Sequence, residues 1–341
     1  MSSLKRLARG YAFTAWKRCR ATDRVVATIV GALTTLITTL LLYHIEKRRG
    51  YLCRDAHKPI PTYVPCSCGA AVGIGFLASM STLYAYHPDP WYLAAALSVA
   101  VGMVVGILDD LFDLRPLLKI CLASLVALPI LALGTYVPRP WVPFVGYARL
   151  TIVYPLLIVL LCTVIVNGFN MIDTHNGVMP FAGLSLSLGA FLALLVHGDR
   201  IGTDIALAAL IVLATYLPFN LYPAKLFNGN AGSFTIGAIA SIVAIECRLE
   251  SFAVLALAPM MINGFLYLVS AKGFKQKQNV RRPTIVDNGS ICSSPDPEAP
   301  ITFVRLVVSH ECLDEKRLVI ALYASFAVST IIALTVELSM R

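Results

Sequence analysis

Ten long apolar segments constrain this chain more than any other feature. Most are close to the length of about 20 residues that an α-helix needs to cross the hydrocarbon core of a membrane. We expect them near residues 25–43, 68–86, 91–108, 117–135, 150–166, 178–197, 202–219, 231–247, 251–271 and 318–337. Charged residues make up 14% of the chain, whereas soluble domains usually have about 25%. The expected fold class is therefore all-α, a polytopic membrane protein with about ten transmembrane helices.

The segments between and before the spans predict a simple domain organisation. Residues 1–24 are polar and basic and form an N-terminal tail, and residues 25–341 form a single transmembrane domain with a polar loop at 272–317. No small-residue cleavage site follows the first apolar segment, so we expect a membrane span there rather than a signal peptide.

Nearly all side chains capable of chemistry fall in the loops of one membrane face, at 54–65, 108–116, 167–178, 219–233 and 272–317. The full inter-span loops of this face, 44–67, 109–116, 167–177, 220–230 and 272–317, hold fifteen Lys and Arg residues, against five on the other face. This excess predicts that the motif-bearing face is cytoplasmic. The seven basic residues of the N-terminal tail favour the inverse orientation.

The net charge of +9 is typical of basic loops beside anionic lipid. The sequence has no recognition helix, zinc finger or aromatic–basic patch, so no nucleic-acid partner is expected.

Three aspartates, Asp109, Asp110 and Asp113, stand at the end of the third span. Carboxylates near hydrocarbon are costly and usually functional. Asp109 and Asp113 share one helix face, and Asp110 points about 100° away. This cluster favours a divalent cation or a proton-transfer role. The alternative is a solvated loop in which Asp113 pairs with Arg115.

The short loop at 167–177 is dense in polar groups. Asn170 and Asp173 are three residues apart, so both can face one bound group, and Asn167 lies one turn earlier. Amide and carboxylate oxygens suit a hard cation such as Mg²⁺. The alternative is a helix cap followed by a turn. It would explain Asn176 and Gly177 but not the other polar residues of the loop.

A glycine-rich turn, residues 228–233, opens the eighth span. Its small residues would let backbone N–H groups approach an anion at a helix N-terminus. An ordinary turn with an N-cap explains the same pattern equally well.

Four basic side chains are candidates for binding phosphate: Lys58, Lys119, Arg281 and Arg282. Two adjacent arginines can bind phosphate oxygens through their planar guanidinium groups, and Pro283 stiffens the chain after them. Each lysine could instead extend its stem along apolar surface to the membrane interface.

The nine cysteines do not resemble a disulfide scaffold. Cys53, His57, Cys66 and Cys68 have a spacing that matches no common zinc pattern, so a zinc site is a minor alternative.

Several segments together carry a family resemblance: HKPIPTYVP (57–65), GILDDLFDLRP (106–116), NGFNMIDTHNGV (167–178), YPAKLFNGNAGS (222–233) and RRPTIVDNG (281–289) followed by PDPEAPIT (295–302). In this order they resemble the polyprenyl-phosphate N-acetylhexosamine-1-phosphate transferases, of glycosyltransferase 4 type. The resemblance runs from about residue 50 to 310 and is strongest to the archaeal branch, which transfers GlcNAc-1-phosphate to dolichyl phosphate.

The resemblance implies a reaction, its partners and its site. UDP-GlcNAc, or a related UDP-N-acetylhexosamine, and dolichyl or polyprenyl phosphate would give GlcNAc-pyrophosphoryl-dolichol and UMP, the first membrane step of lipid-linked glycan assembly for N-glycosylation. Membrane lipid surrounds such an enzyme, and the sequence allows a homodimer. The implied residues are Asp109, Asp110 and Asp113 for catalysis, Lys58, Lys119, Asn167, Asn176, Arg281 and Arg282 for substrate, and Asp173, Asn170 and Asn230 for Mg²⁺, with Mn²⁺ as the alternative metal.

One departure from the family pattern concerns the metal. Asn230 stands where the family usually has an aspartate, so Asp173 is expected to be the one carboxylate ligand between the two loops. A catalytically inactive relative that binds lipid or nucleotide sugar is therefore the alternative. A secondary transporter is disfavoured because we find no inverted repeat and no ionisable residues near midspan.

Overall fold

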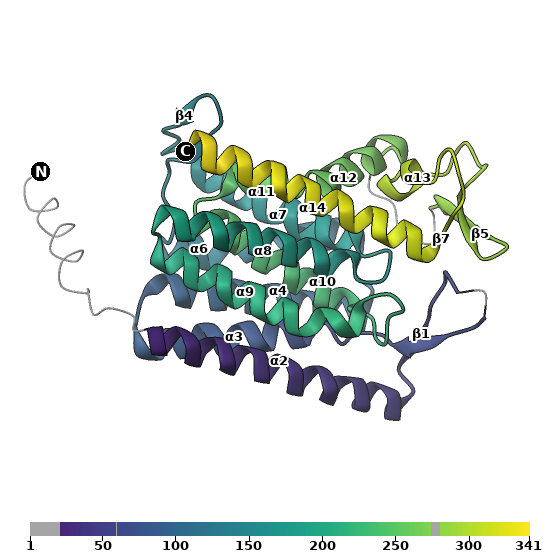
Figure 1. Cartoon of the computed structure of the whole chain (residues 1–341), viewed down its shortest axis with the longest axis horizontal. Coiled ribbons are helices and arrows are strands. Elements are labelled where there is room, and N and C mark those ends of the chain that lie inside the picture. The colour runs from purple at the N-terminus through teal and green to yellow at the C-terminus, as the bar shows by residue number, and fades with distance from the viewer. Residues whose placement is uncertain (1–20, 59, 274–279) are drawn as a thin grey trace, which may run out of the picture.

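The computed structural model describes residues 21–58, 60–273 and 280–341. Long helices dominate this part of the chain, with a few short strands in the loops (Figure 1). The helices are α2 (Ala21–Arg49), α3 (Ala70–Tyr86), α4 (Pro90–Phe112), α5 (Pro116–Ala123), η1 (Ser124–Ala127), α6 (Leu128–Leu133), α7 (Tyr154–Ile172), α8 (Val178–His197), α9 (Arg200–Asn220), α10 (Gly229–Ile245), α11 (Glu250–Ala256), α12 (Ala258–Ser270), α13 (Phe303–Val307) and α14 (Glu315–Met340).

The predicted all-α membrane fold is confirmed. Seven helices of the described chain are long and apolar enough to cross a membrane, counting Pro116–Leu133 as one of them. The bent pair α11 and α12, with 69° between its halves, would be an eighth. The apolar helices α3 and α10 lie at two further predicted spans but have only 17 residues each. A count of ten spans therefore remains a prediction.

Helix α10 forms the centre of the bundle. Every residue from Ala231 to Ile245 is buried, and α10 packs against α3, α4, α7 and α8. A Cβ atom at Gly106 of α4 would lie only 2.4 Å from the carbonyl oxygen of Asn230. Small residues thus let α4 approach the start of α10 closely, as is common between membrane helices.

The loops with strands gather at one end of the bundle. Helix α2 begins at the end where α14 finishes, and β1, β5 and β7 lie at the opposite end (Figure 1). Strand β1 (Leu52–Arg54) pairs with β2 (Tyr63–Pro65), and β5 (Thr284–Asp287), β6 (Ser290–Ser293) and β7 (Leu313–Asp314) form a three-stranded sheet. A separate pair, β3 (Trp141–Val142) and β4 (Gly146–Tyr147), lies at the other end.

Two disulfides correct the expectation drawn from the cysteine pattern. Cys53 is bonded to Cys66 across the β1–β2 hairpin, and Cys292 is bonded to Cys312. The first bond uses two of the cysteines considered for zinc, so that cysteine–zinc alternative is wrong. The antiparallel hairpin is what brings Cys53 close to Cys66, and the spacing of the cysteines alone does not show it.

Two predicted polar segments are more ordered than expected. Residues 1–20 of the predicted tail lie outside the described chain, but α2 already begins at Ala21. The predicted loop at 272–317 contains β5, β6, β7 and α13, and α14 begins within it at Glu315.

Candidate active site

The start of α10 brings the sequence motifs together. Gly229 opens the helix with a φ of +66°, and a Cβ atom there would lie 2.4 Å from the hydroxyl of Ser67 and 2.8 Å from a carboxylate oxygen of Asp110. Glycine is therefore the residue that this turn and these close approaches allow.

Asp110 binds the N-terminus of α10. Its carboxylate accepts hydrogen bonds from the backbone N–H groups of Asn230 at 2.8 Å and Ala231 at 3.0 Å, and from the hydroxyl of Ser67. The anion expected at this helix N-terminus is thus the chain's own aspartate. The positive end of the helix dipole stabilises such a carboxylate.

Asp109 faces the other way and forms a buried ion pair. Its Oδ1 lies 2.8 Å from Nζ of Lys119 and accepts a hydrogen bond from the N–H of Leu114 at 3.0 Å. Asp109 is 1% exposed, and its Oδ2 has no hydrogen-bond partner among the described residues. A half-satisfied buried carboxylate is costly, which favours a role for that second oxygen.

Asp113 differs from both of its neighbours. It ends α4 in a left-handed conformation, and its side chain is 88% exposed and 4.0 Å from Nζ of Lys119. The aspartate motif therefore supplies a helix anchor, a buried ion pair and a surface carboxylate.

The end of α7 meets the start of α10 through amides. Asn170 donates from Nδ2 to Oδ1 of Asn230 and to the hydroxyl of Ser233, both at 2.9 Å. Asn228 donates from Nδ2 to Oδ1 of Asp173 at 2.8 Å. The structure thus brings the three predicted metal ligands to the same turn, where Asn170 contacts Asn230 and Asp173 contacts Asn228. Their donor set of one carboxylate and two amide oxygens fits a hard divalent cation.

Asn167 is placed one turn away from these contacts. Its Nδ2 donates to the carbonyl oxygen of Thr163 in the same helix, at 2.8 Å. The described contacts do not connect it to the network at the start of α10.

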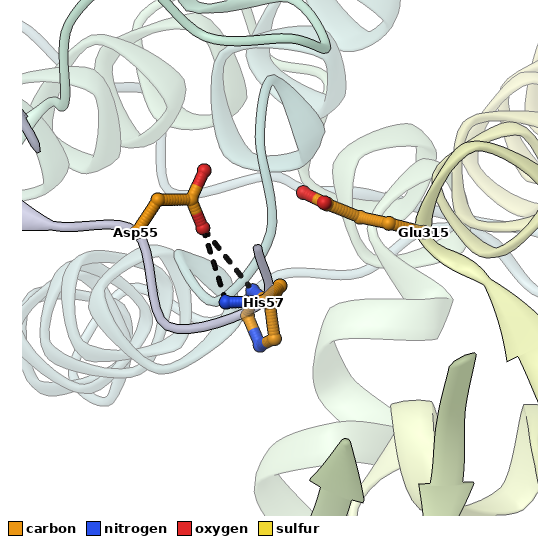
Figure 2. Close-up of side chains that lie close together, drawn as sticks. All are labelled: Asp55, His57 and Glu315. Carbon is orange, nitrogen blue, oxygen red and sulfur yellow. Dashed lines mark hydrogen bonds and ion pairs between the residues drawn. The ribbon is translucent and has the colours of Figure 1, made fainter. Parts of the chain in front are cut away.

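Lys58 and Asn176 lie in a second cluster, with Asp55, His57 and Glu315. Lys58 places Nζ 2.5 Å from Glu315 and 4.0 Å from Asp55, over the ring of Tyr222. Figure 2 shows the carboxylates of Asp55 and Glu315 turned toward one another, with His57 beside Asp55. We refer to Asp55, His57, Lys58, Asn176 and Glu315 as the loop cluster.

His57, which is half-buried, stacks on the buried His175, with ring centroids 4.3 Å apart. Burial lowers the pKa of His57, and the neighbouring Lys58 charge lowers it further, although Asp55 opposes both. Burial also lowers the pKa of His175 well below its ordinary value. Both imidazoles are therefore neutral near pH 7.

The loop cluster also has the composition of a metal site. Ligand atoms of Asp55, His57 and Glu315 all lie within 4.8 Å of one another. The ammonium group of Lys58 already pairs with both carboxylates, however, so a metal ion would have to displace it.

The two arginines considered for phosphate lie near β5. Arg281 pairs with Asp296 at 2.6 Å and with Glu298 at 3.2 Å, and its side chain is 60% exposed. Arg282 is also exposed. Lys275 and Lys277 of the same basic stretch lie outside the described residues.

Three residues that contact the site were not predicted from the sequence: Asp55, Ser67 and Glu315. His57 was considered only for the zinc alternative, and Asn228 and Ser233 only as parts of the glycine-rich turn. The three-residue spacing of Asp55 and Lys58 is a signal that could have identified Asp55. Glu315 lies 257 residues from Lys58 and has no such signal.

Comparison with known proteins finds one matching family. The sequence model for glycosyl transferase family 4 matches residues 92–248, which include the aspartate motif, Lys119 and the network at the start of α10. Lys58, Arg281 and Glu315 fall outside that match.

Curated relatives extend the match to most of the chain. A Saccharolobus solfataricus protein, provisionally named a UDP-N-acetylglucosamine--dolichyl-phosphate N-acetylglucosaminephosphotransferase, is 26% identical over 91% of this chain and 95% of its own length. A Sulfolobus acidocaldarius protein with the same provisional name is 29% identical over 65% of this chain and 70% of its own length. A Bacillus subtilis protein named a probable undecaprenyl-phosphate N-acetylglucosaminyl 1-phosphate transferase is 28% identical over 70% of this chain and 68% of its own length. The chain is thus similar to glycosyl transferase family 4 over residues 92–248, and to these named transferases over 65–91% of its length.

Proposed function

We propose that this protein transfers GlcNAc-1-phosphate from UDP-GlcNAc to dolichyl phosphate, giving GlcNAc-pyrophosphoryl-dolichol and UMP. The observation that carries the proposal is the meeting of the aspartate motif, the 170–173 segment and the 228–233 turn at one end of an apolar helix bundle. A site at the end of such a bundle would lie between the membrane, which supplies the lipid, and water, which supplies the nucleotide sugar. The names of the relatives support both substrates.

Mg²⁺ is the cofactor that the donor set supports, and Asp173, Asn170 and Asn230 would hold it. When bound, the ion would offset the negative charge of the UDP-GlcNAc pyrophosphate. Asn230 is neutral where the family usually has a carboxylate, so Asp173 supplies the negative charge of this set. The amide contacts of Asn170 and Asn228 fix the two loops relative to each other.

Asp109 and Lys119 are proposed to act on the lipid phosphate. Lys119 attracts the phosphate to the membrane surface, and Asp109 holds the ammonium in place at 2.8 Å. An oxygen of the lipid phosphate forms a bond to the sugar-bearing phosphorus, and the bond from that phosphorus to the UMP oxygen breaks. The second pKa of a phosphate is near neutrality, so positioning contributes more than proton removal.

Asp110 is proposed to act by fixing the turn that carries Asn230. Its carboxylate is held by two backbone N–H groups and a hydroxyl, so it has less freedom to contact substrate than Asp109. Arg281 and Arg282, which precede β5, would also bind phosphate. Arg281 would first have to break its ion pair with Asp296. Asp113, exposed at the end of α4, would contribute charge near Lys119.

The motif face is proposed to lie in the cytoplasm, where nucleotide sugars are made. The excess of basic residues in its loops supports this orientation. Both disulfides lie in the loops of this face, which suits a cytoplasm that keeps disulfides oxidised, as in hyperthermophilic archaea. Labelling of single-cysteine variants at Ser309 in sealed cells tests this. An impermeant reagent added outside should not react there, and reaction would invert the topology.

An assay with purified protein tests the function directly. Dolichyl phosphate and a panel of radiolabelled UDP-sugars are incubated with and without Mg²⁺, and lipid-linked product and UMP are measured. We expect product from UDP-GlcNAc only when Mg²⁺ is present. Binding of UDP-GlcNAc without turnover would instead favour the inactive relative, in which Asn230 has replaced a required carboxylate.

A further inference from the structure

One carboxylate outside the family match connects two candidate substrate-binding residues. Glu315 accepts hydrogen bonds from Lys58 on Oε2, at 2.5 Å, and from Asn176 on Oε1, at 3.1 Å. Lys58 comes from the loop after β1, and Asn176 comes from the loop before α8. Both oxygens of Glu315 are therefore used to hold two loops that are far apart in the sequence.

Asp55 completes the arrangement from the opposite side. Its Oδ2 accepts a hydrogen bond from the same Nδ2 of Asn176, at 3.3 Å, and lies 4.0 Å from Nζ of Lys58. Its Oδ1 accepts from the backbone N–H of His57 at 3.2 Å. The two carboxylates thus act on the same ammonium and the same amide.

The chain holds each carboxylate firmly. Asp55 follows Cys53 by two residues, and Cys53 is bonded to Cys66. Glu315 is in the first turn of α14, where Asp314 caps the helix by accepting from the N–H of Arg317 at 2.8 Å. Cys312, three residues before Glu315, is bonded to Cys292. Both disulfides therefore stiffen segments that carry this arrangement.

The burial of these charges argues for a role beyond stability. The side chains of Asp55 and Glu315 are 4% and 5% exposed, and that of Lys58 is 16% exposed. Buried ion pairs are often no more stabilising than apolar residues of the same size, but they do fix geometry. The loop cluster has two carboxylates for one ammonium, so Lys58 is more tightly held than a single surface pair would hold it.

We propose that Glu315, assisted by Asp55, is a positioning residue that fixes Lys58 and Asn176 for binding of the nucleotide sugar. The inference rests on the proposed function, because Asn176 stands three residues after the candidate metal ligand Asp173. Through Glu315, the start of α14 and the adjoining sheet are coupled to the active-site loops. The ammonium of Lys58 is the cation of the loop cluster, and no metal ion is required there.

The test compares Glu315→Gln with Glu311→Gln, a matched change at an exposed residue four positions earlier. Acylation of Lys58 by an amine-reactive reagent is measured by peptide mass spectrometry, and steady-state rates are measured against UDP-GlcNAc concentration. Glu315→Gln should speed Lys58 acylation and raise the KM for UDP-GlcNAc about tenfold each, the effect of losing one charged hydrogen bond. The value of kcat should fall less than KM rises, and Glu311→Gln should change neither readout.

Further variants keep the proposal open to refutation. Asp55→Asn alters the carboxylate that lies further from Lys58. It should also speed Lys58 acylation and raise the KM for UDP-GlcNAc, but less than Glu315→Gln does. Combining Lys58→Met with Glu315→Gln should raise KM by less than the product of the two single effects, because part of the Glu315→Gln effect acts through Lys58. If the two substitutions raised KM by independent factors that multiply, the positioning role of Glu315 would be contradicted.

The two readouts separate the possible failures. Absence of transfer by the wild type would overturn the proposed function, while the acylation rates would still decide whether Glu315 holds Lys58. An unchanged rate of Lys58 acylation in Glu315→Gln would show that Glu315 does not hold Lys58. Faster acylation with an unchanged KM would show that Glu315 has no role in binding the nucleotide sugar. Stoichiometric Zn²⁺ or Mn²⁺ in the purified wild type that is lost in Glu315→Gln would assign the loop cluster to a metal instead.

Discussion

Both ends of the helix bundle contain buried carboxylates, but the two ends use them differently. At the end away from the motifs, Asp204 pairs with Arg24 at 2.5 Å and accepts from the hydroxyl of Tyr92 at 2.7 Å. Glu337 pairs there with Arg341 at 2.6 Å and with His197 at 3.1 Å. These contacts join one helix to another or tie down the C-terminus, which is a structural use of charge.

At the motif end, the carboxylates lie at the ends of helices and contact loops or other helix ends. Asp110 binds the start of α10, Asp173 is connected to it through Asn228, and Glu315 holds two loops at once. Burial of an acid therefore does not by itself indicate a site. What distinguishes the motif end is that polar side chains from several loops converge around one helix N-terminus.

The largest expected effect is at the candidate metal ligands. Asp173→Asn should abolish Mg²⁺-dependent transfer, because it removes the charged oxygen from a set that otherwise has only amides. Asn230→Asp should be tolerated and should lower the Mg²⁺ concentration needed for half-maximal rate. Initial rates against Mg²⁺ concentration measure both. Full Mg²⁺-dependent activity in Asp173→Asn would move the metal assignment to the aspartate motif.

A smaller loss of activity is expected when the hydrogen bonds from the start of α10 to Asp110 are weakened. Asp110→Asn keeps the size of the side chain but replaces a charged acceptor of two backbone N–H groups by a neutral one. We expect turnover to fall about 10²-fold, as for other losses of a positioned acidic group. Steady-state kinetics of the folded variant check this, and Glu311→Gln, at an exposed position outside the site, serves as the control. Equal rates in Asp110→Asn and the wild type would leave the anchor without a catalytic consequence.

A change at the other end should affect stability and not chemistry. Asp204→Asn removes the buried charge that pairs with Arg24, at an expected cost of about 1–3 kcal/mol in the free energy of unfolding. Thermal unfolding in detergent measures the cost, and the KM for UDP-GlcNAc should stay unchanged. A raised KM would show that the two ends are coupled.

The smallest effect concerns pH. Burial holds the pKa values of His57 and His175 below the value of about 6.5 expected in the unfolded chain. As pH falls through about 6.5, the unfolded chain takes up protons that the folded chain does not, so stability is full above that pH and is lost below it. The thermal midpoint should be lower at about pH 5.5 than at about pH 7.5, and His175→Gln should reduce the difference. A midpoint that rises on acidification would contradict this.

The sequence predicts the membrane helices well because each is encoded by a local run of apolar residues. Helix α10 illustrates this: its predicted span, 231–247, nearly matches the helix at Gly229–Ile245. The break between α11 and α12 was not predicted, since both halves are equally apolar and only a bend separates them.

The candidate site is only partly encoded locally. Asp109 and Asp110 are adjacent, yet one pairs with Lys119 and the other binds α10, because neighbouring helical residues point about 100° apart. The partners of Asp110 lie 120 residues further along the chain, at the start of α10. Glu315 and the two disulfides depend on contacts between distant loops, which no spacing in the sequence reveals.

The most direct test of the account compares one carboxylate from each end in the same assay. UMP release from UDP-GlcNAc in the presence of dolichyl phosphate and Mg²⁺ is measured for the wild type, Asp109→Asn and Asp204→Asn, with each rate normalised to folded protein. We predict that Asp109→Asn lowers kcat about 10²-fold, while Asp204→Asn turns over like the wild type. Equal rates in all three proteins, or an equal loss in both variants, would contradict the assignment of the active site to the motif end.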